Sequence, residues 1–171
     1  MHEYPRLASS CASFTLGSLK EVEDRIVEEL QTSGATRLVV GLQMINLQRA
    51  ITACGMFSMF EAYLQDFLEC VDGFKEANEI LTSHGHAQMA GTFRDYQSAI
   101  NVLKHGRGAS YDRLLGKMDE LPFKLKTEDN YIEGDVSAIS TLIEVNDIFV
   151  LQCADIIEHV YEKLRMEKYG Y

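Results

Sequence analysis

The chain has 171 residues, of which 46% are hydrophobic and 25% are charged, and its net charge at neutral pH is −10. This composition is typical of one globular domain, and the negative charge argues against a protein that coats nucleic acid non-specifically. No window of about 18 uncharged apolar residues is present, so the sequence predicts no membrane span.

Four scattered cysteines, Cys11, Cys54, Cys70 and Cys153, include no CxxC pair. Four cysteines are enough for two disulfides. We favour the other interpretation, in which the thiols are buried and reduced in a cytoplasmic protein. The first residues lack the basic start and continuous apolar run of a secretory signal. We therefore expect a cytoplasmic protein.

The first predicted helix covers residues 17–31. Ser18 followed by Glu21 is a capping-box pattern, which marks a helix start. Residues 1–16 are accordingly predicted to form an N-terminal tail, and residues 17–171 one helical domain. This domain contains a single proline, Pro122, so long helices can continue uninterrupted.

The remaining elements follow in chain order as helices separated by short connections. The apolar residues of the second helix cover more than one face, as expected of a central helix in a bundle. The predicted fold is therefore all-α: a single-domain bundle of four main helices with short extra ones. The predicted helices after the first cover about 36–70, 72–84, 86–105, 110–121 and 136–167, with an irregular connection before the last.

The helix at 86–105 separates a polar stripe from an apolar face at about 100° per residue. Arg94, Ser98, Asn101 and His105 share the stripe, whereas Ile100 falls on the apolar side. Gly106 is a natural residue to end this helix. Two structural interpretations stay open: a plain solvated face, and a histidine favoured by the helix dipole at the C-terminus.

Positive charge is concentrated around this stripe. Residues 94–126 contain seven Lys and Arg against four Asp and Glu, whereas the remainder contains nine against 22. A histidine can transfer protons near neutral pH, and arginine can hold a phosphate group. These residue types suit metal-independent cleavage of RNA, in which the 2′-hydroxyl is the nucleophile.

Two short motifs carry a resemblance to a known family. Residues 60–64, Phe-Glu-Ala-Tyr-Leu, lie in the second helix, and residues 101–106, Asn-Val-Leu-Lys-His-Gly, end the fourth. Together with the all-α pattern, they make the chain resemble the HEPN superfamily (higher eukaryotes and prokaryotes nucleotide-binding domains) over roughly residues 36–165. The resemblance implies a helical bundle that forms a homodimer.

The resemblance also implies a function. Active HEPN proteins are metal-independent endoribonucleases of toxin–antitoxin, defence or RNA-processing systems, with an Arg-polar-x-x-x-His motif. Asn101 matches the polar position and His105 the histidine, but Ile100 stands at the arginine position. Members without the catalytic pair bind nucleotides, RNA or protein partners.

Two functions therefore remain open. The first is RNA binding with endoribonuclease activity, in which His105 is the acid/base, Asn101 its companion and Arg107 the phosphate holder. The candidate substrate-binding residues are then Arg94, Lys104 and Ser98. The second is a catalytically inactive interaction module, such as the partner of a nucleotidyltransferase or a defence-system scaffold.

Other candidate groups are interpreted structurally. His84 and His86, with Asp72 or Cys70, suggest a metal site, but their spacing does not match a zinc motif. We therefore expect neither a metal nor another cofactor. Glu61 is expected at the edge of the core, paired either with Arg49 or with the region of His105.

Overall fold

The computed structural model describes residues 4–127 and 137–170, in which all the regular elements are helices. The predicted all-α bundle is confirmed, with four long helices and two short ones. None of the helices in these ranges is long and apolar enough to cross a lipid bilayer. The elements are α1 (Tyr4–Leu30), α2 (Thr36–Leu68), α3 (Gly73–Ser83), α4 (Ala87–His105), α5 (Ala109–Leu115) and α6 (Asp147–Tyr169), with a 3-10 turn at Met118–Glu120.

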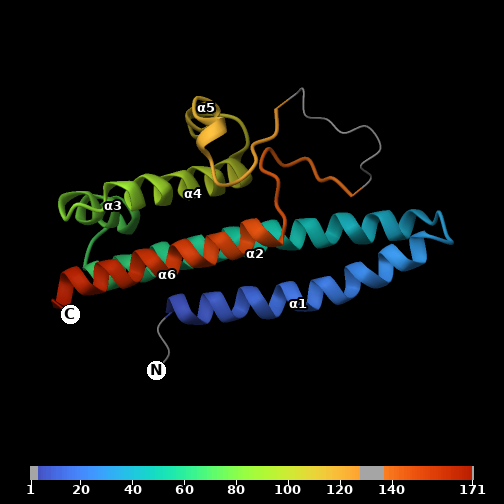
Figure 1. Ribbon diagram of the computed structural model, residues 1–171, viewed down its shortest axis with the longest axis horizontal. Coiled ribbons are helices and arrows are strands. Elements are labelled where there is room, and N and C mark those ends of the chain that lie inside the picture. Colours follow the sequence, from blue (N-terminus) through green and yellow to red (C-terminus); the bar gives the residue numbers. More distant parts are fainter. Residues whose placement is uncertain (1–3, 128–136, 171) are drawn as a thin grey trace.

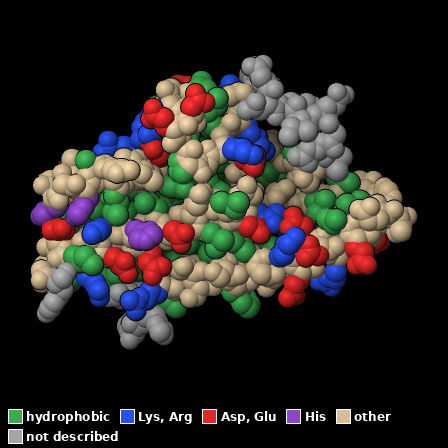
Figure 2. All heavy atoms as spheres, in the orientation of Figure 1, with side chains coloured by type: hydrophobic (Ala, Val, Ile, Leu, Met, Phe, Trp, Pro, Cys, Tyr) green, Lys and Arg blue, Asp and Glu red, His purple; other side chains and the backbone are tan. Residues whose placement is uncertain are grey.

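Three long helices, α1, α2 and α6, lie side by side, and α3, α4 and α5 lie on one side of them (Figure 1). α1 packs against both α2 and α6, which also contact each other and the α3–α4 pair. This arrangement buries α2 on several sides, as its apolar sequence predicts. Acidic and basic side chains are mixed over the face shown in Figure 2.

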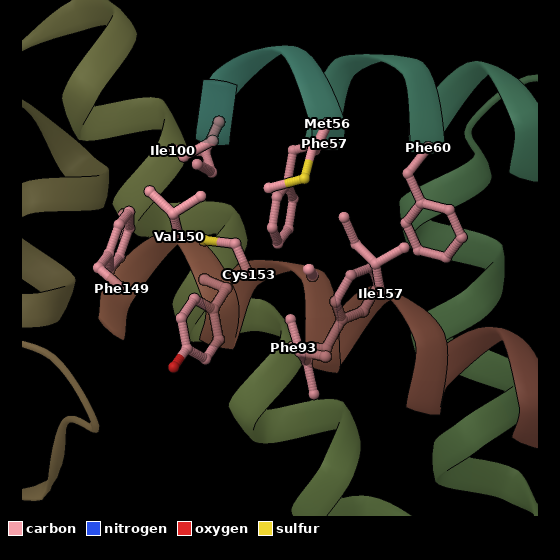
Figure 3. Close-up of a cluster of buried hydrophobic side chains, with 14 of the residues drawn as sticks. Met56, Phe57, Phe60, Phe93, Ile100, Phe149, Val150, Cys153 and Ile157 are labelled. Carbon is pink, nitrogen blue, oxygen red and sulfur yellow. The ribbon is translucent and has the colours of Figure 1, made fainter. Parts of the chain in front are cut away.

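The main core lies where α2, α4 and α6 meet (Figure 3). Aromatic rings from all three helices are buried there, and their edges and faces contact one another. Ile100 is only 4% exposed, so the predicted orientation of this residue toward the apolar side is confirmed. The labelled residues of this core are Met56, Phe57, Phe60, Phe93, Ile100, Phe149, Val150, Cys153 and Ile157.

The predicted N-terminal tail is wrong, because α1 begins at Tyr4 and continues through residue 17. Ala8, Ala12 and Leu16 repeat at i, i+4 and i+8 on one face, and all three are buried in the core. Small alanines let the helices approach closely, but they supply little of the hydrophobic signal that sequence patterns rely on. The capping-box residues Ser18 and Glu21 lie inside the helix and do not start it.

The last helix also starts later than predicted. α6 begins after Asn146, whose side chain accepts a hydrogen bond from the Phe149 amide at 2.9 Å and so caps the helix. Residues 137–145 are not helical, and an antiparallel bridge joins Ile143 to Leu125. Both side chains of the bridge are buried, so the two extended segments close the core beside α4 and α6. Residues 128–136, which contain part of the predicted irregular connection and the predicted start of the last helix, lie outside the described residues.

Candidate functional site

A groove of about 450 Å³ lies between α2, α3 and α4. Its α4 wall contains three of the six predicted site residues, Arg94, Asn101 and Lys104. Its other wall comes from α2 and from the start of α3. The lining residues are Phe57, Ser58, Glu61, Asp72, Phe74, Lys75, Asn78, Glu79, Arg94, Gln97, Ile100, Asn101 and Lys104.

The α4 wall presents two cations. Arg94 and Lys104 are exposed, and no ion pair joins either side chain to an acid in the described part of the chain. Burial raises the pKa of the Cys54 thiol of α2, and the positive charge of Lys104 acts in the opposite direction. The two cations are ten residues apart, about 15 Å along the helix axis. This wall can therefore contact two separate anionic groups.

The opposite wall carries acids, two of which already have partners. Asp72 accepts a hydrogen bond from the Lys75 amide and caps α3, and Glu79 lies 3.9 Å from the Lys75 ammonium group. Glu61 lines the groove without an ion pair among the described residues. The groove thus has one basic wall and one mixed wall.

The floor combines apolar side chains with two amides. Asn78 is only 6% exposed, and its Nδ2 donates to the Phe74 carbonyl at 2.8 Å and to Gln97 Oε1 at 3.3 Å. Asn78 Oδ1 and Gln97 Nε2 are buried without a hydrogen-bond partner among the described residues. Each unsatisfied group costs about 1–3 kcal/mol of stability. The polar pair Asn78 and Gln97 therefore lies directly beneath the apolar part of the groove, with one acceptor and one donor unsatisfied among the described residues.

Ser98 has a structural role that the stripe did not predict. It is buried, and its hydroxyl accepts a hydrogen bond from Arg113 of α5. Arg113 also donates to Asp95 at 2.7 Å, and the Lys117 ammonium group lies 2.6 Å from the same carboxylate. Ser98 therefore helps to fix α5 on α4 and does not face the groove.

His105 and Arg107 are exposed and do not line the groove. His105 is the last residue of α4, and Gly106 ends the helix with a positive φ of 75°, as predicted. The Arg107 guanidinium lies over the Tyr111 ring at 5.4 Å from its centroid. The structure therefore brings Arg94, Asn101 and Lys104 together, whereas Ser98, His105 and Arg107 lie outside the groove.

Sequence reasoning missed Ser58, Asn78 and Gln97. The sequence does contain a sign that the two amides are partly buried, because each lies at the border of the apolar face of its helix. Gln97 follows the buried Tyr96, and Asn78 follows the buried Ala77. Their proximity to each other depends on how α3 folds back on α4, which no local pattern specifies.

Of the two partners considered for Glu61, the structure excludes Arg49. Arg49 is buried and binds Glu23 of α1 and Asp147 of α6, at 2.9 and 2.6 Å. Glu61 lies elsewhere, in the groove wall. Arg49 therefore joins three helices and takes no part in the candidate site.

The histidine pair joins two parts of the fold. His84 and His86 lie 3.6 and 3.3 Å from the Glu167 carboxylate, so they link the turn before α4 to the end of α6. Within residues 4–127 and 137–170, no group of three His, Cys, Asp or Glu is arranged to hold a metal ion.

Comparisons with known proteins add no relative. No protein-family model matches the chain, no curated protein matches it, and no solved structure matches it.

Proposed function

We propose that this protein binds single-stranded RNA along the α4 wall of the groove. Arg94 and Lys104 hold phosphate groups, and Asn101 and Ser58 supply hydrogen bonds to sugar and base edges. The observation that carries the proposal is the pair of cations, without acidic partners among the described residues, on one wall of a groove of about 450 Å³. Cationic side chains spaced along one wall of a groove can follow the phosphate backbone of a single strand.

The charge distribution supports RNA as the ligand. The chain as a whole is acidic, so cations concentrated on one helix and the segment after it create a local attraction for anions. The distance between the two cations exceeds the size of one phosphate group, which favours a polymer over a single anion. The HEPN resemblance at residues 101–106 agrees with this class of ligand.

Cleavage is a separate step, for which the groove supplies fewer parts. Ile100 occupies the arginine position of the HEPN motif and is buried in the core. Arg107 contacts the Tyr111 ring, and His105 lies beyond the lining residues. The proposed function is therefore binding, with His105 as the residue that tests for cleavage.

The test is fluorescence anisotropy with a labelled single-stranded RNA in EDTA. Arg94→Gln combined with Lys104→Gln is expected to weaken binding at least about tenfold, since each phosphate contact is an ionic interaction. Lys20→Gln, on the exposed face of α1, is the matched control and is expected to bind as the wild type does. Equal RNA affinity of the wild type and the double variant would contradict the proposal.

The same samples test cleavage. RNA that remains intact with the wild type identifies a binding protein, whereas cleavage that disappears in His105→Ala identifies a nuclease.

The second candidate is the inactive interaction module, which one observation favours. Glu61 and the other acids oppose the cations across the groove, an arrangement that suits a protein segment with both charges. In that case Glu61→Gln weakens binding to the partner, while its effect on RNA is to strengthen binding by removing a repulsive charge. Glu61→Gln therefore has opposite expected effects on the two ligands: weaker binding of a protein partner and stronger binding of RNA.

A further inference from the structure

The floor of the groove holds one hydrogen-bond acceptor and one hydrogen-bond donor on neighbouring amides. Asn78 of α3 is buried, Gln97 of α4 is partly buried, and both line the groove. Asn78 Oδ1 and Gln97 Nε2 are buried without a hydrogen-bond partner among the described residues. Because an unpaired buried polar group is costly, a ligand that pairs with both groups gains affinity from both hydrogen bonds.

The hydrogen bonds around the two amides determine which atom is the donor and which is the acceptor. The Phe74 carbonyl can only accept, so the nitrogen of Asn78 faces it, at 2.8 Å. The same nitrogen donates to Gln97 at 3.3 Å, so the oxygen of Gln97 faces Asn78. The two atoms that remain are therefore the Asn78 oxygen, an acceptor, and the Gln97 nitrogen, a donor.

Gln97 lies between the two cations of the α4 wall. The residues of α4 that line the groove recur at steps of three, four and three, so they share one side of the helix. In order, they are Arg94, Gln97, Ile100, Asn101 and Lys104, with Ile100 at the edge of this side. Gln97 is about 4.5 Å along the axis from Arg94 and about 10.5 Å from Lys104, at 1.5 Å per residue. A strand whose phosphates contact both cations therefore passes over Gln97.

The α3 wall supplies an aromatic ring next to the two amides. Phe74 lies one turn before Asn78 on the same side of α3, and it lines the groove. Its ring is partly buried and packs against Phe57 and Phe93, with ring centroids 6.1 and 5.4 Å away. Aromatic side chains stack on nucleobases in many proteins that bind single strands. The groove thus offers a surface for the face of a base and two polar groups for its edge.

We propose that the groove holds one unpaired nucleobase of the RNA, with Asn78 Oδ1 and Gln97 Nε2 bound to its Watson–Crick edge. The inference rests on the proposed function, in which Arg94 and Lys104 hold the phosphates. Each of the four bases has a donor next to an acceptor on this edge, such as N3–H and O4 of uracil, so each can pair with both groups. A base in a duplex uses the same atoms to bind its partner strand. The groove therefore selects unpaired nucleotides.

Methylated RNAs test whether this edge is recognised. Three oligouridylates of equal length carry uracil, 3-methyluracil or 5-methyluracil throughout, so their phosphate contacts are the same. The 3-methyl group replaces the N3–H donor, whereas the 5-methyl group leaves the Watson–Crick edge intact. Fluorescence anisotropy is expected to show at least about tenfold weaker binding of the 3-methyl RNA, because Asn78 Oδ1 then stays unpaired. The 5-methyl RNA is expected to bind as the unmodified RNA does.

Gln97→Met tests the donor, because it keeps the length of the side chain and removes the amide. The difference in affinity between the unmodified and the 3-methyl RNA is expected to shrink at least about threefold in this variant. Gln88→Met is the matched control, since Gln88 is exposed on the same helix and does not line the groove. It is expected to keep the full difference. Circular dichroism checks that both variants keep the helical content of the wild type.

Gln97→Glu tests the pairing pattern, because it keeps an oxygen toward Asn78 and turns the donor into a second acceptor. Guanine alone among the four bases has two neighbouring donors on its Watson–Crick edge, N1–H and the 2-amino group. Oligouridylates with one central guanosine or one central inosine, which lacks this amino group, measure the effect. Gln97→Glu is expected to prefer the guanosine RNA at least about fivefold. The wild type and Gln88→Glu are expected to bind both equally, and a Gln97→Glu variant without this preference would contradict the role of Gln97.

The outcomes separate this inference from the proposed function. Equal affinity of the wild type for the unmodified and the 3-methyl RNA would overturn the inference while the phosphate contacts still stand. A Gln97→Met variant that keeps the full difference would also overturn it, because another group would then recognise the edge. Failure of all three oligouridylates to bind would contradict the proposed function as well, and would favour the interaction module.

Discussion

Tyr4 shows how much one side chain contributes to the start of α1. Its hydroxyl donates to the Met56 carbonyl at 2.7 Å, and its ring lies against Phe60 and Tyr63. Burial, with a smaller contribution from Cys11, raises the pKa of Tyr4 from an ordinary value of 10.0 to about 12. The folded protein therefore disfavours the charged phenolate more than the unfolded chain does.

This shift predicts a loss of stability at alkaline pH. Between about pH 10 and 12 the unfolded chain releases the Tyr4 proton while the folded protein retains it, so the free energy of unfolding falls as pH rises. Tyr4→Phe is expected to cost about 1 kcal/mol at pH 7, through the lost hydrogen bond, and to lessen the alkaline decline. Urea unfolding at neutral pH and across the alkaline range measures both effects; identical pH profiles would contradict the prediction.

Residue orientation on α4 could be predicted from the sequence, but the partners of each residue could not. Helical periodicity alone placed Ile100 in the core and Asn101 on the polar side. Ser98 shares the polar stripe by periodicity, yet it is buried because Arg113, fifteen residues later, folds back over it. Which polar residue faces solvent depends on which element covers it.

At the scale of elements, the groove depends on how closely α3 approaches α2. Gly73 begins α3, and a Cβ added there would lie 2.8 Å from the Glu61 carbonyl oxygen and 2.8 Å from Leu64 Cβ. Only glycine permits this contact, so the gap between the two walls of the groove is set at this position.

Gly73→Ala is therefore expected to push α3 away from α2. The free energy of unfolding should fall by about 1–3 kcal/mol, as for other overpacked sites. RNA affinity should fall as well, because the groove walls separate. Gly91→Ala is a suitable control, since it lies inside α4 with nothing within 4 Å of the added Cβ and should stabilise the helix. Equal stability of the two variants, measured by thermal unfolding, would refute this account.

At the scale of the whole molecule, α1 covers a surface shared by α2 and α6. Its first half contributes Ala8, Ala12 and Leu16 to the main core, and its second half contributes Glu23 to the Arg49 ion pairs. The fold therefore requires the N-terminal segment that sequence patterns assign to a tail.

Deletion of residues 1–16 is expected to lower the free energy of unfolding by at least about 3 kcal/mol, because it exposes the apolar surface of α2 and α6. Phe14→Ser is the control, since this side chain is 77% exposed and its replacement should change stability by less than about 0.5 kcal/mol. Thermal unfolding of the shortened chain at the wild-type temperature would show that the segment is dispensable.

Local sequence patterns were sufficient to predict the all-α class. They also predicted the bounds of α2, α3 and α4 to within about two residues, and the sides of α4 on which Ile100 and Asn101 lie. These features follow from periodicity and from residues that end helices, which act within a few turns of chain. Three other features emerge only in the folded chain: Asn78 meets Gln97, Arg49 binds Glu23 and Asp147, and residues 4–16 belong to the core. Such contacts join residues far apart in the chain, so they depend on the packing of whole helices, which no local pattern encodes.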